Sequence, residues 1–281
     1  MGQGSRWCWL WGGVLLLAGS SEAVRLKYQG KPGDRFVYGV GLAIHTAMES
    51  GTQRITLPAR VTLRIVVEVL KAEEKSLTLR YKVEKARMEV GGQATPLGLP
   101  PSMVVTMQRN GKVTRVERED EGKPAPAIPT SLQPSLADVA TQLFLVFPEK
   151  DLRPGDSWSH QGEAITPFGG SVNLRGKSTF LGEEEIGGRR CAKIRTEFTV
   201  PFSLPIKFFP DQASQGTMKG TLRGTATTYF DLQVGHLARS STEARSDTVM
   251  AAPPGPSGQQ VSVKAAANVR STIQRLSEGN R

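Results

Sequence analysis

Cysteine and histidine are scarce in this sequence, and their scarcity excludes whole classes of site. The chain has two cysteines and three histidines, and no histidine stands at metal-ligand spacing from another histidine or a cysteine. A zinc site built from one local motif is therefore excluded. Cys8 falls in a predicted leader peptide, so Cys191 has no partner for an intramolecular disulfide. Strand alternation places Cys191 opposite Ile194 and Phe198, which predicts an exposed thiol.

The local motifs of common enzymes are also missing. There is no G-x-S-x-G elbow, no S-x-x-K motif in a helical setting, no phosphate-binding loop and no dinucleotide fingerprint. His45, His160 and His236 are far apart in the chain, so a hydrolytic site would have to be assembled across the fold. We predict no catalytic residue, no metal and no cofactor, and we expect that the protein is not an enzyme.

The one long apolar run lies at the N-terminus and has the pattern of a secretory signal peptide. Arg6 is basic, residues 7–18 are apolar apart from two glycines, and Ser21 and Ala23 are small residues at the positions that a signal peptidase recognises. We predict residues 1–23 as a signal peptide; an uncleaved anchor is the alternative, although spanning a bilayer takes about 20 apolar residues. No cysteine stands at the cut. The expected product is exported to the periplasm or the medium, is not lipid-anchored and has no transmembrane span.

The net charge of +10 favours anionic partners such as lipid head groups or acidic envelope polymers. The basic residues are scattered and mostly alternate with apolar ones, which is typical of the solvated face of a sheet. No basic run is interleaved with aromatic residues, and no segment has the pattern of a recognition helix. We therefore predict no nucleic-acid partner, and a peripheral membrane contact stays open.

Period-2 alternation dominates the rest of the chain and predicts a mainly β fold. Successive side chains of a strand point to opposite faces, so alternating apolar and polar residues indicate a strand with one buried face. Most strands are about five or six residues long, yet these patterns persist over far longer stretches. Long antiparallel strands twist and curl, which predicts a strongly curved sheet or half-barrel. The clearest strand patterns lie at residues 62–69, 77–84, 191–200, 217–233 and 261–273.

The pattern over residues 217–233 carries the candidate ligand-binding residues. Its apolar face includes Gly220 and Gly224, and a glycine inside a strand marks a bend or the close approach of another group. One interpretation is steric, since a curved sheet needs small residues on its concave side. The other is a site for an apolar ligand. The candidate ligand-binding residues on this face are Met218, Leu222, Ala226 and Phe230.

One segment, residues 135–150, has the pattern of a helix. Ser135 is suited to cap it, an apolar stripe runs from Leu136 to Phe147, and Pro148 stops it. Proline, glycine and serine mark loops elsewhere. The loop predicted at residues 201–216 is unusually apolar, which fits either a segment that fills the core or a lid.

Two pairs of short stretches indicate an internal duplication. Residues 31–36 and 153–158 share the order basic, Pro, Gly, Asp, any residue, aromatic; residues 110–115 and 234–239 share a glycine-centred turn that leads into a strand. We predict a first β unit at 24–134, the connecting helix at 135–150 and a second β unit at 151–281. Each Pro-Gly-Asp sequence predicts a turn whose carboxylate binds nearby backbone N–H groups.

The stretch from Phe147 to Trp158, FPEKDLRPGDSW, resembles a signature of uncharacterised bacterial exported proteins and lipoproteins with repeated Pro-Gly-Asp-x-aromatic motifs. Residues 187–194 also resemble the turn and strand that follow in that family. The family has no assigned activity, so the resemblance implies a β fold and export and transfers no active site. This chain lacks the lipidated cysteine of the lipoprotein members, which puts a membrane anchor in doubt.

Three functional hypotheses follow. The first is a non-enzymatic envelope protein that binds an apolar or amphipathic, lipid-like ligand in a curved sheet, with an architecture analogous to that of periplasmic lipoprotein carriers. The second is a structural or interaction module that docks an anionic envelope partner through its basic face. The third is a hydrolase with a site assembled across the fold. The sequence does not identify the ligand or the oligomeric state.

Overall fold

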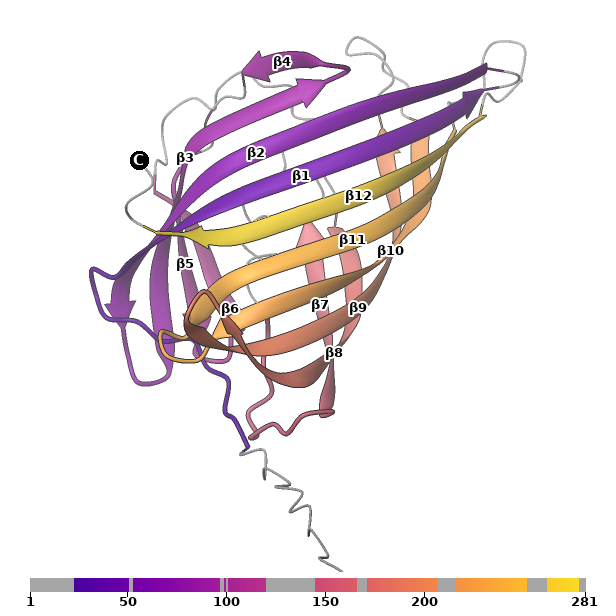
Figure 1. Cartoon of the computed structure of the whole chain (residues 1–281). Helices are drawn as coiled ribbons and strands as arrows, with labels where there is room; N and C mark the ends of the chain where they lie inside the picture. The colour runs from indigo at the N-terminus through magenta and orange to yellow at the C-terminus, as the bar shows by residue number, and fades with distance from the viewer. Residues whose placement is uncertain are drawn as a thin grey trace, which may run out of the picture.

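The computed structural model describes residues 23–50, 53–96, 99, 101–119, 145–165, 171–206, 216–251 and 262–277. Twelve strands form one antiparallel sheet in the order β6-β5-β3-β2-β1-β12-β11-β10-β9-β8-β7, with β4 paired to β3 (Figure 1). The strands are β1 (Arg35–Ser50), β2 (Gln53–Ala72), β3 (Ser76–Val90), β4 (Gln93–Pro96), β5 (Met103–Gln108), β6 (Val113–Arg118), β7 (Ser157–Ile165), β8 (Ser171–Ile186), β9 (Arg189–Ile206), β10 (Gly216–Asp231), β11 (His236–Ala251) and β12 (Ser262–Leu276).

The predicted mainly β fold with long antiparallel strands in a curved sheet is confirmed. Both predicted halves belong to the same sheet, because β1 pairs with β12 from Val37↔Leu276 to Glu49↔Lys264. The division into related units at 135–150 stays a prediction. Of the predicted helix, residues 135–144 lie outside the described residues, and residues 145–150 form no helix. The described part of the chain contains no helix of the length and hydropathy needed to cross a membrane.

The loop predicted at residues 201–216 is wrong over its first part, since β9 continues to Ile206. Pro201 and Pro205 suggested a break, yet both occupy ladder positions opposite residues of β10. Val200, Phe202 and Leu204 are apolar at alternate positions, which continues the strand pattern and outweighs the proline content. Residues 207–215, like most of the predicted signal peptide, lie outside the described residues.

The hydrophobic core fills one end of the curved sheet, here called the filled end. Leu26 and Tyr28 precede the first strand, and Phe147 and Leu152 precede β7; all four are buried against side chains from strands as distant in the sheet as β5 and β8. A single cluster can contact both halves only on the concave side of the sheet. We call the side that carries this core the inner face.

The two Pro-Gly-Asp turns at the filled end make the same hydrogen bonds. The Asp34 carboxylate accepts from the Lys31 backbone N–H at 2.7 Å, and the Asp156 carboxylate accepts from the Arg153 N–H at 2.9 Å. The turn glycines have φ angles of 91° and 93°, which favour glycine. Each turn also exchanges two backbone hydrogen bonds with a strand, β2 or β8. The prediction that both carboxylates serve their turns is confirmed.

Candidate functional site

Beyond the filled end, the inner face of six consecutive strands carries no charged side chain. Cross-strand partners in an antiparallel sheet lie on the same face, so the registers assign each residue to a side. Most of these inner side chains are half-buried, whereas their sequence neighbours on the outer face are mostly exposed. The inner positions are Phe198, Val200 and Phe202 of β9; Met218, Gly220, Leu222, Gly224 and Ala226 of β10; Thr242, Ala244, Ser246, Thr248 and Met250 of β11; Val263, Ala265, Ala267, Val269 and Ser271 of β12; Val40, Leu42, Ile44, Thr46 and Met48 of β1; and Ile55, Leu57, Ala59, Val61 and Leu63 of β2.

The outer face of the same strands carries the charges. In register across β10, β11 and β12 stand Arg223, Arg245 and Asn268, and one row nearer the filled end Arg270 pairs with Glu243 at 3.3 Å. The scattered basic residues of the sequence therefore gather on one side of the sheet. An uncharged face opposite a charged one is the arrangement expected of a sheet that buries or binds apolar material on one side.

The four predicted ligand-binding residues separate into two environments. Met218 and Leu222 are half-buried and pack with Val200 in a small apolar cluster, away from the main core. Ala226 lies on the same face between this cluster and the filled end. Phe230 is only 2 % exposed in the main core, where its ring lies 4.8 Å from that of Phe147. Their role in ligand binding stays a prediction, and Phe230 is suited to packing.

Aromatic rings cover the two glycines of the inner face. A Cβ on Gly224 would lie 2.6 Å from Cζ of Phe198, and one on Gly220 would lie 2.6 Å from Cζ of Phe202. Each aromatic residue is the direct β9 partner of the glycine that it covers. The glycines therefore give room to neighbouring side chains, which supports the steric interpretation of these positions.

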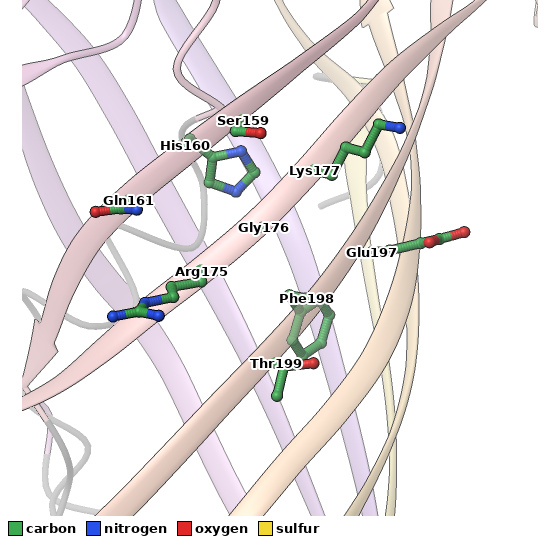
Figure 2. A pocket seen from close by; sticks show the side chains of 9 residues that line it. All are labelled: Ser159, His160, Gln161, Arg175, Gly176, Lys177, Glu197, Phe198 and Thr199. Carbon is green, nitrogen blue, oxygen red and sulfur yellow. The ribbon is translucent and has the colours of Figure 1, made fainter.

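A third pair of this kind borders a cavity of about 340 Å³ near the β7 edge (Figure 2). His160 of β7 lies over Gly176 of β8, where a Cβ would come within 2.4 Å of Nε2, and Phe198 of β9 follows in the same row. The lining also contains cations, so the cavity is polar on one side. Its lining residues are Ser159, His160, Gln161, Arg175, Gly176, Lys177, Glu197, Phe198 and Thr199.

The geometry around His160 lacks the parts of a hydrolytic site within the described residues. Its Nδ1 is buried without a hydrogen-bond partner, and burial lowers the pKa of the ring below its usual value. No carboxylate orients it, and the described ranges hold no group of three or more His, Cys, Asp or Glu side chains that could bind a metal. His45 is exposed on β1, and His236 is buried at the filled end. The structure does not bring the three histidines together.

A buried polar cluster at the filled end escaped the sequence analysis. Arg275 donates to the Asp231 carboxylate at 2.5 Å, and the side chains of the pair are 8 % and 2 % exposed. Asp231 also accepts the backbone N–H groups of Gln233 and Val234. An aspartate at the start of a turn was the only local signal for this cluster. Its partner comes from the last strand, which no sequence spacing predicts.

His236 and Cys191 are two further buried groups at the filled end. Nε2 of His236 donates to the Gln29 carbonyl at 2.6 Å, and its ring stacks on Phe36 at a centroid distance of 3.9 Å. The predicted exposure of Cys191 is wrong: the residue is fully buried, and burial raises the pKa of its thiol. Its strand is paired on both sides, with Glu184 and with Asp231, and at the filled end alternation no longer separates buried from exposed positions.

No protein-family model and no curated protein matches this sequence. Among solved structures, DynF from the dynemicin biosynthesis pathway of Micromonospora chersina is 9% identical, with 94% of this chain and 90% of that chain covered and a TM-score of 0.25. The hypothetical lipoprotein YmcC from Escherichia coli is 13% identical, with 84% and 87% covered and a TM-score of 0.25. OccK2 of Pseudomonas aeruginosa, in complex with glucuronate, is 7% identical, with 89% and 98% covered and a TM-score of 0.26. TM-scores this low support no inference about function.

Proposed function

We propose that this protein is a non-enzymatic, exported envelope protein that binds an apolar or amphipathic, lipid-like ligand on the inner face of its sheet. The observation that carries the proposal is that, among the described residues, the inner positions of β9 to β12, β1 and β2 carry no charge beyond the filled end. If the uncharged inner face served only to enclose the core, it would end where the core ends. Instead it continues well past the filled end.

The far part of the inner face also exposes large apolar side chains. Ile55, Leu57 and Val90 are 51 %, 39 % and 38 % exposed. Burying apolar surface is favourable by about 25 cal/mol per Å², so an apolar ligand laid along this face would gain stability from contacts that water now occupies. Single exposed apolar residues are ordinary; a continuous uncharged face that contains several is better explained by binding.

Export and the absence of catalysis belong to the same proposal. The pattern of residues 1–23 supports export. The separation of His45, His160 and His236 in the described structure supports a binding role over hydrolysis. The resemblance to exported proteins and lipoproteins favours an envelope location.

A second candidate function is an interaction module that docks an anionic envelope partner. It is favoured by Arg223 and Arg245, which stand directly opposite each other on the outer face. Like charges in that position repel, and an anionic partner would relieve the repulsion. The two functions differ in the face that they use, so substitutions on one face distinguish them.

Substituting a lysine on the inner face is expected to weaken binding of an apolar probe about tenfold or more, since an ammonium group among apolar contacts loses its hydration. The variants are Leu222→Lys and Ala267→Lys. Their controls are Thr225→Lys and Asn268→Lys, which add the same charge to exposed outer positions of the same two strands. Binding of 1-N-phenylnaphthylamine is measured by fluorescence titration, and circular dichroism confirms folding.

The same proteins, exported to a bacterial periplasm and purified without detergent, are then weighed by native mass spectrometry. An added mass on the parent and on the outer-face controls that is missing from the inner-face variants would support the carrier function. Saturable probe binding that is unaffected by the inner-face lysines, or a bare mass together with no probe binding by the parent, would contradict it.

A further inference from the structure

The hairpin of β1 and β2 extends beyond the neighbouring strand at the end opposite the core, here called the far end. β3 stops at Val90, opposite Ala59, so no strand among the described residues pairs with residues 53–58 of β2 on that side. These six residues are exposed on both faces of the sheet. In Figure 1 the ends of β1, β2 and β12 project together from the sheet.

Exposed apolar side chains lie on the inner face of this projecting edge and at one outer-face position beside it. Ile55 and Leu57 point to the inner face and are 51 % and 39 % exposed, and Met48 stands opposite Ile55. Val249 of β11, two strands away from β1, points to the outer face and is 44 % exposed. Covering the exposed apolar groups of this edge would remove their surface from water, which is favourable.

Cations lie beside these apolar groups in one outer-face row. Arg54, Glu49, Lys264, Val249 and Lys219 are consecutive cross-strand partners from β2 to β10. Glu49 is 3.9 Å from Arg54, and the described residues provide no ion pair for Lys219 or Lys264. We call Arg54, Ile55, Leu57, Lys219, Val249 and Lys264 the far rim.

We propose that the far rim docks on the surface of an anionic lipid bilayer. Lysine and arginine place their charges among lipid head groups while their alkyl stems and the neighbouring apolar side chains enter the interface. A bilayer interface can surround a thin projecting edge and cover both of its faces at once. A folded acidic protein that covered one face would leave either Val249 or Ile55 and Leu57 in water.

This inference rests on the proposed function for its biological sense, because the rim continues directly into the uncharged inner face. Ile55 and Leu57 are the last apolar inner positions of β2 and lie beside Met48 and Thr46 of β1. A lipid-like ligand that leaves the bilayer at the rim would therefore reach the binding face without crossing the charged outer face.

Co-sedimentation of the full exported chain with vesicles tests the docking. Vesicles of equal parts phosphatidylglycerol and phosphatidylcholine are compared with vesicles of phosphatidylcholine alone. We expect binding to the anionic vesicles that weakens as salt rises, because salt screens exposed charges. The double variants Lys219→Glu/Lys264→Glu and Ile55→Ser/Leu57→Ser should each lower the vesicle partition coefficient at least tenfold.

The matched control is Lys27→Glu/Lys82→Glu, which makes the same change in net charge at exposed positions near the filled end. It should retain most of the vesicle binding. Equal losses in this control and the Lys219/Lys264 variant would overturn the proposal, because binding would then follow net charge alone. Undiminished binding in either rim variant would overturn it too, as would a chain that ignores vesicles and binds only an acidic protein.

Phenylnaphthylamine titration of the same variants separates this inference from the proposed function. A Lys219→Glu/Lys264→Glu variant that loses vesicle binding and still binds the probe supports docking at the rim as a step distinct from ligand binding, because both lysines lie on the outer face. A parent chain that binds the probe and ignores anionic vesicles overturns the docking proposal and leaves the proposed function standing. A chain that binds vesicles, has no added mass and binds no probe contradicts the proposed function alone.

Discussion

Replacing Asp231 by asparagine is expected to lower the free energy of unfolding by about 3–5 kcal/mol, because breaking one partner of a buried ion pair leaves the other charge uncompensated. Arg275 is 92 % buried at its side chain and its Nη1 already has no hydrogen-bond partner among the described residues. Without the carboxylate at 2.5 Å the guanidinium would keep its charge in the core. Urea unfolding followed by circular dichroism measures the difference.

Asp247→Asn is the matched control for this prediction. Asp247 lies 3.3 Å from Arg245 on the outer face, where the two side chains are 71 % and 67 % exposed. Exposed ion pairs contribute about 0–1 kcal/mol, so this variant should unfold almost as the parent does. If Asp231→Asn lowers the free energy of unfolding no more than Asp247→Asn does, the buried pair does not stabilise the fold.

A double variant measures how much of the lost stability comes from the uncompensated charge of Arg275. Asp231→Asn combined with Arg275→Met removes both charges and keeps apolar volume near Tyr38. The double variant should be more stable than Asp231→Asn alone, because no buried guanidinium then lacks a counterion. A double variant as unstable as the sum of the two single ones would show that the residues act independently.

Acid is expected to destabilise the fold between pH 6.5 and pH 4 through His236. Burial lowers the pKa of this ring to about 4, from an ordinary value near 6.5. A histidine with a lowered folded-state pKa stays neutral in the native protein, so its contribution to stability is complete above pH 6.5 and is lost as the pH falls toward 4. A shift of this size corresponds to about 3 kcal/mol.

The structure explains why the neutral ring is preferred. The ring lies between Phe36 and Tyr28 with only 2 % of the residue exposed, and this burial outweighs the hydrogen bond from Nε2 to the Gln29 carbonyl, which by itself raises the pKa. The nearby Arg275 lowers the pKa further, although burial is the larger cause. Protonation would place a second cation in the core beside that guanidinium.

Comparing His236→Gln with the parent isolates this contribution, since carboxylates titrate in the same pH range and are common to both. The amide N–H can still donate to the Gln29 carbonyl and does not titrate. The stability gap between the two proteins should narrow as the pH falls from 7.5 to 4.5. His45→Gln, at an exposed position of β1, should follow the parent at every pH. Parallel stability curves for His236→Gln and the parent would contradict the prediction.

Much of the fold follows from local patterns. Alternation over residues 62–69 and 217–233 identified two of the longest strands, and the Pro-Gly-Asp sequences identified two turns with the hydrogen bonds expected of them. Proline content misled the prediction at residues 201–206, where alternation was the better guide. The face of β10 that carries Met218 and Leu222 was also predictable, because alternation assigns each residue of a strand to a side.

The burial of a residue also depends on its position along the strand, and this dependence was not predictable from alternation. Phe230 shares a face with Met218, yet one is in the core and the other is half-buried at the far end. Cys191 was predicted to be exposed and is buried, and His236 gave no sign of its partner at Gln29. Each of these outcomes depends on which end of the sheet is covered.

The sequence by itself determined the strands, their two faces and the turns that join them, because these depend on neighbours a few residues apart. Only the tertiary structure decided which end of the sheet holds the core. That end is fixed by contacts between distant segments, such as the hydrogen bond from the Leu145 N–H to the Tyr28 hydroxyl at 2.9 Å and the Asp231–Arg275 pair. Such contacts depend on how the sheet curves to bring its two halves around one cluster. No periodicity in the sequence encodes this curvature.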